Sequence, residues 1–197
     1  AIGFLTSVLS SVIIEKNINI ALPSIGLFIS WILYLKWYST FKNRENNKIL
    51  EVGNQLPELT LEDIHKNEVS TSSFIGNPSI YFFYRGNWCP LCMAQIKEIA
   101  SQYKELEKRN ANVVFISPQP HVHTNSLANK FGLRFNYLTD KNNTVAKQLQ
   151  ILSKNGIPMG FQVLGYDSDT VMPTVVITDT KGNIIFADLT DQNLQCS

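Results

Sequence analysis

The sequence predicts an α/β domain, in which helices flank a central mixed sheet, behind an apolar N-terminal segment of one or two transmembrane helices. Two runs, 79–84 and 112–117, have the apolar and aromatic composition of buried strands. The stretch between them has helical periodicity, so the three elements form a parallel strand-helix-strand unit. A Cys-x-x-Cys pair, Cys89 and Cys92, stands where this helix begins. These observations together indicate a redox domain.

The first part of the chain is too apolar for a soluble domain. Residues 1–14 carry no charge, and 17–35 form a second uncharged run that would extend about 28 Å as a helix, close to the hydrocarbon thickness of a bilayer. Aromatic residues gather near the end of this run, where they favour a membrane interface. Residues 1–37 are therefore predicted to be a membrane anchor, and a buried core helix is the alternative.

A basic linker, 38–50, follows the predicted anchor. Lys42, Arg44 and Lys48, together with Lys36, are opposed only by Glu45. The positive-inside rule places such a flank in the cytoplasm. We therefore expect a protein anchored in a bacterial inner membrane. The basic residues favour the cytoplasmic side for the redox domain, although a single span in the opposite orientation would reverse this.

The remaining segment, 51–197, is long enough for one compact core. Its elements are expected in the following order: an edge strand at 58–62, a turn and short helix at 69–74, the strand at 79–84, an amphipathic helix through Leu106, the strand at 112–117, a helix at 126–131, an extended segment at 135–138, a helix at 144–151, and a hairpin of 171–178 with 183–187. The net charge of +1, without a sustained basic face, does not indicate nucleic-acid binding.

This order of elements is that of the thioredoxin arrangement. The helix that normally follows the hairpin is missing, because 189–197 is too short and polar to cover a sheet. The chain also begins without Met. We therefore expect a fragment or an altered tail. Cys196, in that tail, is interpreted as an incidental thiol or as a third redox cysteine.

The cysteine pair has the spacing that a dithiol needs. Cysteines three apart at a helix start lie about one turn from each other, and the unpaired N–H groups and dipole there stabilise a thiolate on Cys89. Pro90 suits the first helical turn, and Arg85 adds positive charge nearby. Such chemistry requires no metal or organic cofactor, because the Cys89–Cys92 disulfide is itself the redox group.

Two other interpretations of the cysteines stay open. A zinc site would need a second pair of ligands, and the chain offers only Cys196 and the histidines His65, His121 and His123. His121 and His123 fall in a Pro-rich turn before a helix. A purely structural role for Cys89 and Cys92 is the second alternative.

Five segments resemble the alkyl hydroperoxide reductase/thiol-specific antioxidant (AhpC/TSA, redoxin) family, the peroxiredoxin-like branch of the thioredoxin superfamily. The resemblance covers nearly all of 51–188. The segments are Gly53-x-x-x-Pro57-x-Leu59, Phe83-Tyr84-Arg85-Gly86-x-Trp88-Cys89-Pro90-x-Cys92, Val114-Phe115-Ile116-Ser117, Phe131-Gly132-Leu133-x-Phe135 and Pro173-Thr174-x-x-Ile177-x-Asp179-x-x-Gly182.

The resemblance bears on which chemistry applies. Peroxidases of the family carry Pro-x-x-x-Thr-x-x-Cys and a later Arg. On this chain the peroxidatic Cys falls on Cys92, the Thr on Cys89, the Pro on Arg85 and the Arg on Pro173, so three of these four groups are absent. Met172-Pro173-Thr174 instead resembles the thioredoxin element in which a cis proline lies beside the dithiol. A trans proline that starts an edge strand is the alternative.

The favoured function is therefore a thiol-disulfide oxidoreductase with an antioxidant role, in which Cys89 attacks and Cys92 resolves. Trp88 and Pro173 would line the docking surface, next to Met172 and Thr174, while Pro90 and Leu91 would tune the potential. The resemblance implies a protein thiol or disulfide, or a hydroperoxide, as substrate, and an external reductant such as a thioredoxin or glutathione system. One alternative is a thiol peroxidase in which Cys92, or Cys89, attacks hydroperoxides, the other cysteine resolves, and Arg85 stabilises the thiolate. The other alternative is an inactive membrane-tethered binding module.

Overall fold

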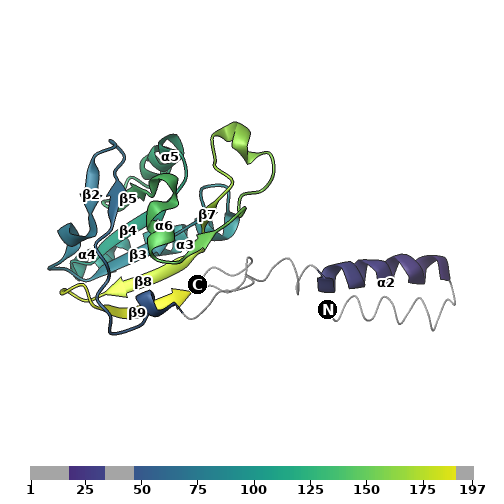
Figure 1. The fold of residues 1–197 in the computed structure, drawn as a ribbon, viewed down its shortest axis with the longest axis horizontal. Coiled ribbons are helices and arrows are strands. Elements are labelled where there is room, and N and C mark those ends of the chain that lie inside the picture. Colours follow the sequence, from purple (N-terminus) through teal and green to yellow (C-terminus); the bar gives the residue numbers. More distant parts are fainter. Residues whose placement is uncertain (1–17, 34–46, 190–197) are drawn as a thin grey trace. The chain divides into compact units, whose positions relative to one another are not determined.

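A computed structural model describes residues 18–33 and 47–189 (Figure 1). The first range is the helix α2 (Ile18–Leu33), which belongs to a separate compact unit from the domain that follows. Residues 1–17, 34–46 and 190–197 lie outside the described residues. They hold most of the predicted anchor (1–37) and linker (38–50), as well as Cys196.

The predicted transmembrane helix is not found in the described part of the chain. α2 has 16 residues, including Pro23. Within 18–33 and 47–189, no helix combines the length and apolar character needed to cross a membrane.

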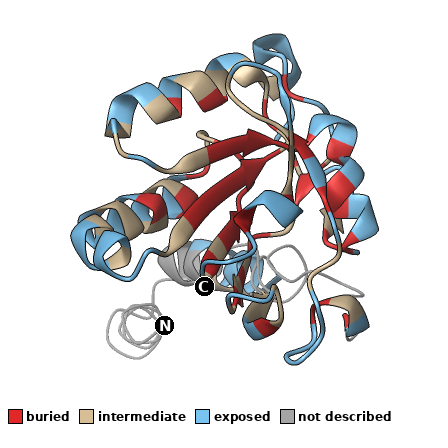
Figure 2. Cartoon of the chain, turned by 90° about the vertical axis from the view of Figure 1, so that its left-hand side faces the viewer, coloured by how far each residue is buried: buried red, intermediate tan, exposed pale blue. Residues whose placement is uncertain are grey.

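The domain is built on a seven-stranded mixed sheet, which confirms the predicted α/β class. The order is β2-β1-β5-β4-β3-β8-β9, with β3, β4 and β5 parallel and the other pairs antiparallel. The strands are β1 (Thr60–Glu62), β2 (Glu68–Ser70), β3 (Ser79–Phe83), β4 (Asn112–Ser117), β5 (Asn136–Thr139), β8 (Thr174–Thr178) and β9 (Ile184–Leu189). Figure 2 shows the buried strands running between the helices that flank them.

Helices cover both faces of this sheet because successive strand residues point to opposite sides. In β3 and just after it, Phe82 and Tyr84 belong to one core cluster, whereas Tyr81 and Phe83 belong to the other. The first cluster includes side chains from α3 and α5, and the second includes side chains from α6. The helices are α3 (Pro90–Ser101), α4 (Tyr103–Lys108), α5 (His121–Phe131) and α6 (Thr144–Gln148). Short 3₁₀ turns lie at Lys48–Leu50, Thr71–Phe74, Lys141–Asn143 and Phe161–Leu164.

Several element boundaries differ from the prediction. The edge strand is β2 rather than β1, and only Thr71–Phe74 of the predicted turn and helix is helical. The predicted amphipathic helix breaks at Gln102, which has φ −92° and ψ 7°. Val171 belongs not to the hairpin but to β7 (Thr170–Val171), which pairs with β6 (Leu152–Ser153).

The predicted cis proline is wrong. No peptide bond between the described residues is cis, so the bond before Pro173 is trans. The proline is buried and immediately precedes β8, which lies between β3 and β9 and is not an edge strand. A proline is tolerated here because it stands just outside the ladder, which begins at Thr174.

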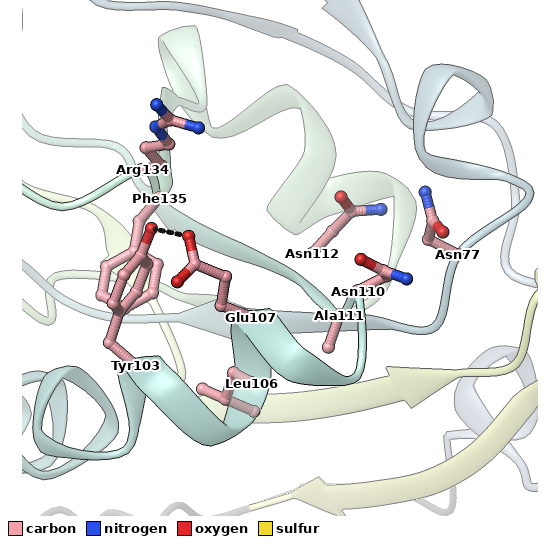
Figure 3. A pocket seen from close by; sticks show the side chains of 9 residues that line it. All are labelled: Asn77, Tyr103, Leu106, Glu107, Asn110, Ala111, Asn112, Arg134 and Phe135. Atoms are coloured by element: carbon pink, nitrogen blue, oxygen red, sulfur yellow. Dashed lines mark hydrogen bonds between the residues drawn. The ribbon is translucent and has the colours of Figure 1, made fainter.

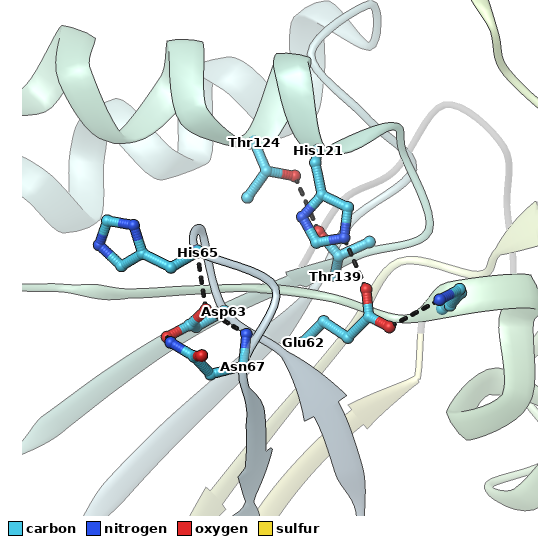
Figure 4. A network of polar contacts seen from close by, with 8 residues as sticks. Glu62, Asp63, His65, Asn67, His121, Thr124 and Thr139 are labelled. Carbon is cyan, nitrogen blue, oxygen red and sulfur yellow. Dashed lines mark hydrogen bonds and ion pairs between the residues drawn. The ribbon is translucent and has the colours of Figure 1, made fainter.

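A cluster of charged side chains joins β1 to the start of α5 (Figure 4). Glu62 contacts His121 Nε2 at 2.7 Å through one carboxylate oxygen and accepts from Lys141 Nζ at 2.9 Å through the other. These hydrogen bonds, first from Lys141 and then from His121, hold the pKa of Glu62 below its ordinary value of 4.5. The cluster therefore needs an ionised Glu62.

This linkage gives an expected dependence of stability on pH. A carboxyl whose folded pKa is lowered contributes stability above its unfolded pKa, and that contribution is lost as the pH falls through the folded pKa. The free energy of unfolding should therefore fall below about pH 4.5. The free energy of unfolding of Glu62→Gln, measured by urea titration at several pH values between 3 and 6, should fall less steeply with decreasing pH than that of the wild type. Glu51→Gln, at an exposed position, is the matched control, and equal slopes for all three proteins would contradict the assignment.

Candidate active site

The two cysteines lie side by side where β3 leads into α3. Cys89 is the N-cap of α3 and Pro90 occupies its first turn, as predicted. The two sulfurs are 2.7 Å apart, and Cys89 Sγ accepts a hydrogen bond from the Cys92 N–H at 3.4 Å. Because a disulfide has an S–S length of about 2.05 Å, the ring can close with little backbone movement.

The two cysteines are both buried, and they differ slightly in exposure. Cys89 is 6% exposed, whereas Cys92 is 0% exposed and lies in the core cluster with Phe82, Tyr84 and Ile96. Cys89 is thus the more exposed residue of the pair. Burial raises the pKa of Tyr84 above its ordinary value, so the Tyr84 hydroxyl stays protonated in the same core cluster as Cys92.

The turn before Cys89 places Arg85 and Trp88 at the site. The Arg85 guanidinium carbon lies 5.0 Å from the centroid of the Trp88 ring, and Arg85 Nη2 donates to the Gly156 carbonyl. Trp88 also packs on Phe161, with ring centroids 5.5 Å apart. Arg85 Nε and Trp88 Nε1 are buried and have no hydrogen-bond partner among the described residues. Both N–H groups could therefore donate a hydrogen bond to a bound molecule.

Gly86 is required by the path of the turn. Its φ is +146°, a conformation that residues with a side chain rarely adopt. A Cβ at this position would lie 2.8 Å from Trp88 Nε1 and 3.2 Å from Tyr166 Cε1. The absence of a side chain at Gly86 therefore lets the Trp88 indole pack against the Gly86 backbone.

A buried glutamine, which the sequence analysis did not identify, contacts the same turn. Gln119 follows β4 and is 1% exposed. Its Oε1 accepts from the Asn87 N–H at 2.9 Å, and its Nε2 donates to Asn87 Oδ1 at 3.1 Å and to the Tyr84 hydroxyl at 2.9 Å. The signal that was available is its position: ligand and catalytic groups gather beyond the carboxyl ends of parallel strands, and β3 and β4 are adjacent and parallel.

The segment Met172-Pro173-Thr174 reaches the site only in part. Thr174 pairs with Phe83 across the ladder, which places Pro173 near the end of β3. The Met172 side chain, however, packs against the core cluster on the opposite face from the cysteines. The structure thus brings Cys89, Pro90 and Cys92 together at the start of α3, with Trp88 packed against the cluster of the two cysteines. Arg85 lies over the Trp88 ring, and Met172 is separated from the cysteines.

The histidines proposed as alternative metal ligands have other partners. His121 and His123 lie in the first turn of α5 rather than in a loop. His121 contacts Glu62, and His123 stacks on Tyr166 with a centroid distance of 4.9 Å.

A polar pocket of about 240 Å³ lies away from the dithiol (Figure 3). It is bordered by α4 and by residues flanking β3, β4 and β5, and the Tyr103 hydroxyl donates to Glu107 at 2.8 Å on one side of it. None of the predicted site residues lines this pocket.

Fold and site together define a thioredoxin-like α/β protein with a cysteine pair at a helix N-terminus. The model of the AhpC/TSA family matches residues 52–187, so the chain belongs to this family, in agreement with the resemblance of its motifs.

The curated relatives are named as peroxiredoxins. Peroxiredoxin Q, chloroplastic, of Sedum lineare is 32% identical over 117 residues, which are 56% of this chain and 63% of that protein. The putative peroxiredoxin bcp of Helicobacter pylori is 27% identical over 133 residues, covering 68% of this chain and 84% of that protein. The chain spans less than two thirds of the length of the plant relatives it matches.

Solved structures have the same fold at low sequence identity. The Xylella fastidiosa PrxQ structure has a TM-score of 0.59 at 15% identity and covers 75% of this chain and 89% of its own. The Mycobacterium tuberculosis peroxidoxin BcpB has a TM-score of 0.60 at 20% identity and covers 71% and 86%, respectively.

These comparisons correct the predicted location in a bacterial inner membrane. The plant relatives are named as chloroplast proteins, and no helix in the described ranges is long and apolar enough to cross a membrane.

Proposed function

We propose that the chain is a thiol-dependent peroxidase that uses Cys89 as its nucleophile and Cys92 as its resolving thiol. The observation that carries this proposal is the asymmetry of the pair: Cys89 is the N-cap and is 6% exposed, whereas Cys92 is 0% exposed, with its sulfur 2.7 Å away. A helix N-terminus stabilises a thiolate at the first position. Membership of the AhpC/TSA family and the peroxiredoxin names of the relatives support a hydroperoxide as the oxidant.

The proposed cycle has two steps on the enzyme. The Cys89 thiolate attacks the terminal oxygen of the hydroperoxide, the O–O bond breaks, and the alkoxide leaves as an alcohol after taking a proton, so that Cys89 becomes a sulfenic acid. The Cys92 sulfur then attacks the Cys89 sulfur, the S–S bond forms, and hydroxide leaves as water with the Cys92 proton. The two thiols are oxidised by two electrons and the peroxide is reduced by two. An external dithiol then reduces the disulfide by exchange.

Arg85 and Trp88 are the groups proposed to donate hydrogen bonds to the peroxide. Arg85 Nε–H and Trp88 Nε1–H are buried donors without partners among the described residues. Hydrogen bonds from such donors to the peroxide oxygens would stabilise the charge that develops as the O–O bond breaks. Arg85 would thereby take over the role of the Arg that this chain replaces with Pro173.

Disulfide exchange with a protein is the second candidate. It is favoured by a specific observation: the Thr, Pro and Arg of the family's peroxidase motif are replaced by Cys89, Arg85 and Pro173. In this case Cys89 would attack a substrate disulfide, and Cys92 would release the product by forming the same Cys89–Cys92 bond.

One experiment on the full chain separates the two candidates. Reduced protein is mixed with hydrogen peroxide or with cumene hydroperoxide, and Trp fluorescence follows the oxidation, with peroxide consumption measured under excess dithiothreitol. Oxidation much faster than that of glutathione at the same pH supports the peroxidase. Slow oxidation together with reduction of insulin disulfides would assign disulfide exchange, and no rate in either assay would indicate an inactive binding module.

A further inference from the structure

Gln119 connects the surroundings of the two cysteines through one side-chain amide. Its oxygen holds the backbone N–H of Asn87, and its nitrogen holds both the Asn87 side chain and the Tyr84 hydroxyl, with all three distances between 2.9 and 3.1 Å. Asn87 is two residues before Cys89, and Tyr84 shares the core cluster of Cys92. The Gln119 amide therefore contacts Asn87, in the turn before Cys89, and Tyr84, in the core cluster that contains Cys92.

The turn held by Gln119 fixes the N-terminus of α3. The N–H of Cys89 donates to the Gly86 carbonyl at 3.1 Å, and Asn87 Nδ2 donates to the His123 carbonyl at 2.8 Å. Asn87 is thus held from β4 through Gln119 and from α5 through its own amide. A displacement of Asn87 would move Cys89 relative to the Cys92 N–H that its sulfur accepts.

We propose that Gln119 is a positioning residue that sets the reactivity of Cys89 and the reduction potential of the Cys89–Cys92 pair. By holding Asn87 it keeps Cys89 Sγ aligned with the helix N-terminus, where the thiolate is stabilised. Gln119 Nε2 donates to Tyr84 Oη, so the hydroxyl acts as an acceptor toward Gln119. The Tyr84 O–H proton therefore points away from Gln119. The proposal rests on the thiol chemistry of Cys89 proposed above.

A merely structural role would give a different result. A buried amide with several hydrogen bonds contributes to stability, so its loss lowers the melting temperature whatever its role at the site. The test therefore needs a variant of the same network that does not touch the turn. Thr124 provides it: its hydroxyl lies 3.4 Å from Gln119 Nε2 and 3.2 Å from Thr139 Oγ1, and it is fully buried.

The experiment compares Gln119→Met, which keeps the volume and removes the hydrogen bonds, with Thr124→Val in the full chain. The rate of Cys89 alkylation by iodoacetamide is measured against pH by mass spectrometry, and the dithiol is equilibrated with dithiothreitol. In Gln119→Met we expect the pH midpoint to rise by about 1 unit and the equilibrium constant to change about tenfold. Thr124→Val should lower only the melting temperature.

An unchanged midpoint and equilibrium constant in Gln119→Met, with a lower melting temperature, would overturn the proposal. If Gln119→Met does not fold, Gln119→Asn decides, because it stays neutral but is one methylene shorter and therefore cannot hold both Asn87 and Tyr84. An unchanged midpoint and equilibrium constant in that variant would also overturn the proposal. Neither readout uses a peroxide or a protein disulfide. A failure of the proposed function in the peroxide and insulin assays is therefore distinguishable from a failure of this inference.

Discussion

Cys89→Ser is expected to abolish turnover with peroxide, lowering the rate by about three orders of magnitude or more. The serine hydroxyl keeps the N-cap hydrogen bond to α3 but does not form a thiolate at neutral pH. The fold should therefore survive while the chemistry is lost. The measurement is peroxide consumption under excess reductant, with circular dichroism to verify that the variant is folded.

Cys92→Ser is the matched control, and it should fail at a different step. Cys89 can still attack, so one equivalent of peroxide is consumed, but the sulfenic acid has no resolving partner at 2.7 Å. Dimedone should label Cys89 in this variant and not in the wild type. If fast oxidation persists in Cys89→Ser and is lost in Cys92→Ser, then Cys92 is the attacking thiol and Cys89 the resolving one. This is the assignment that the family's peroxidase motif implies when it is aligned with this chain.

Gly86→Ala is expected to cost about 2–6 kcal/mol of the free energy of unfolding, the sum of a positive-φ penalty and an overpacking penalty of about 1–3 kcal/mol each. The backbone φ of +146° disfavours any Cβ, and this Cβ would lie 2.8 Å from Trp88 Nε1 and 2.9 Å from Trp88 Cδ1. The indole is large and is packed against Phe161, so it cannot move aside cheaply. Urea unfolding measures the loss, and Trp fluorescence should report a displaced Trp88.

The variant Gly76→Ala separates the positive-φ penalty from the overpacking penalty. Gly76 has a φ of +107° but nothing within 4 Å of an added Cβ. This variant should therefore lose only the conformational part, about 1–3 kcal/mol. A loss in Gly86→Ala no larger than that in Gly76→Ala would mean that Trp88 is free to move, and it would contradict the close packing described for the turn.

The sequence was sufficient where the physics is local. The apolar run of β3, the turn after it and the helix with Pro90 in its first turn were all predictable, because composition, periodicity and capping chemistry coincide there. The break at Gln102 was not predictable, because neither Gly nor Pro marks it and the helical periodicity continues into α4.

Features set by distant contacts were missed. Gln119 stands between two prolines and reads as an ordinary turn residue, and only the parallel pairing of β3 with β4 brings it to Asn87. Met172-Pro173-Thr174 matched a thioredoxin element in sequence, yet the peptide is trans and Met172 faces the opposite cluster. Apolarity alone predicted a membrane span at 17–35, and among the described residues no helix is both long and apolar enough to cross a membrane.

The hydrogen bonds of the active-site turn have a consequence for how the chain matures. Asn87 meets Gln119 across 32 residues, Arg85 meets Gly156 across 71, and Arg85 meets Thr170 across 85. The two sulfurs are only three residues apart. Loops of such different length close on different timescales, so the cysteines can meet in a growing chain long before their surroundings exist. During synthesis the dithiol is thus open to oxidation as an ordinary pair of thiols, and the surroundings described above exist only when Thr170 has been added and the domain has closed.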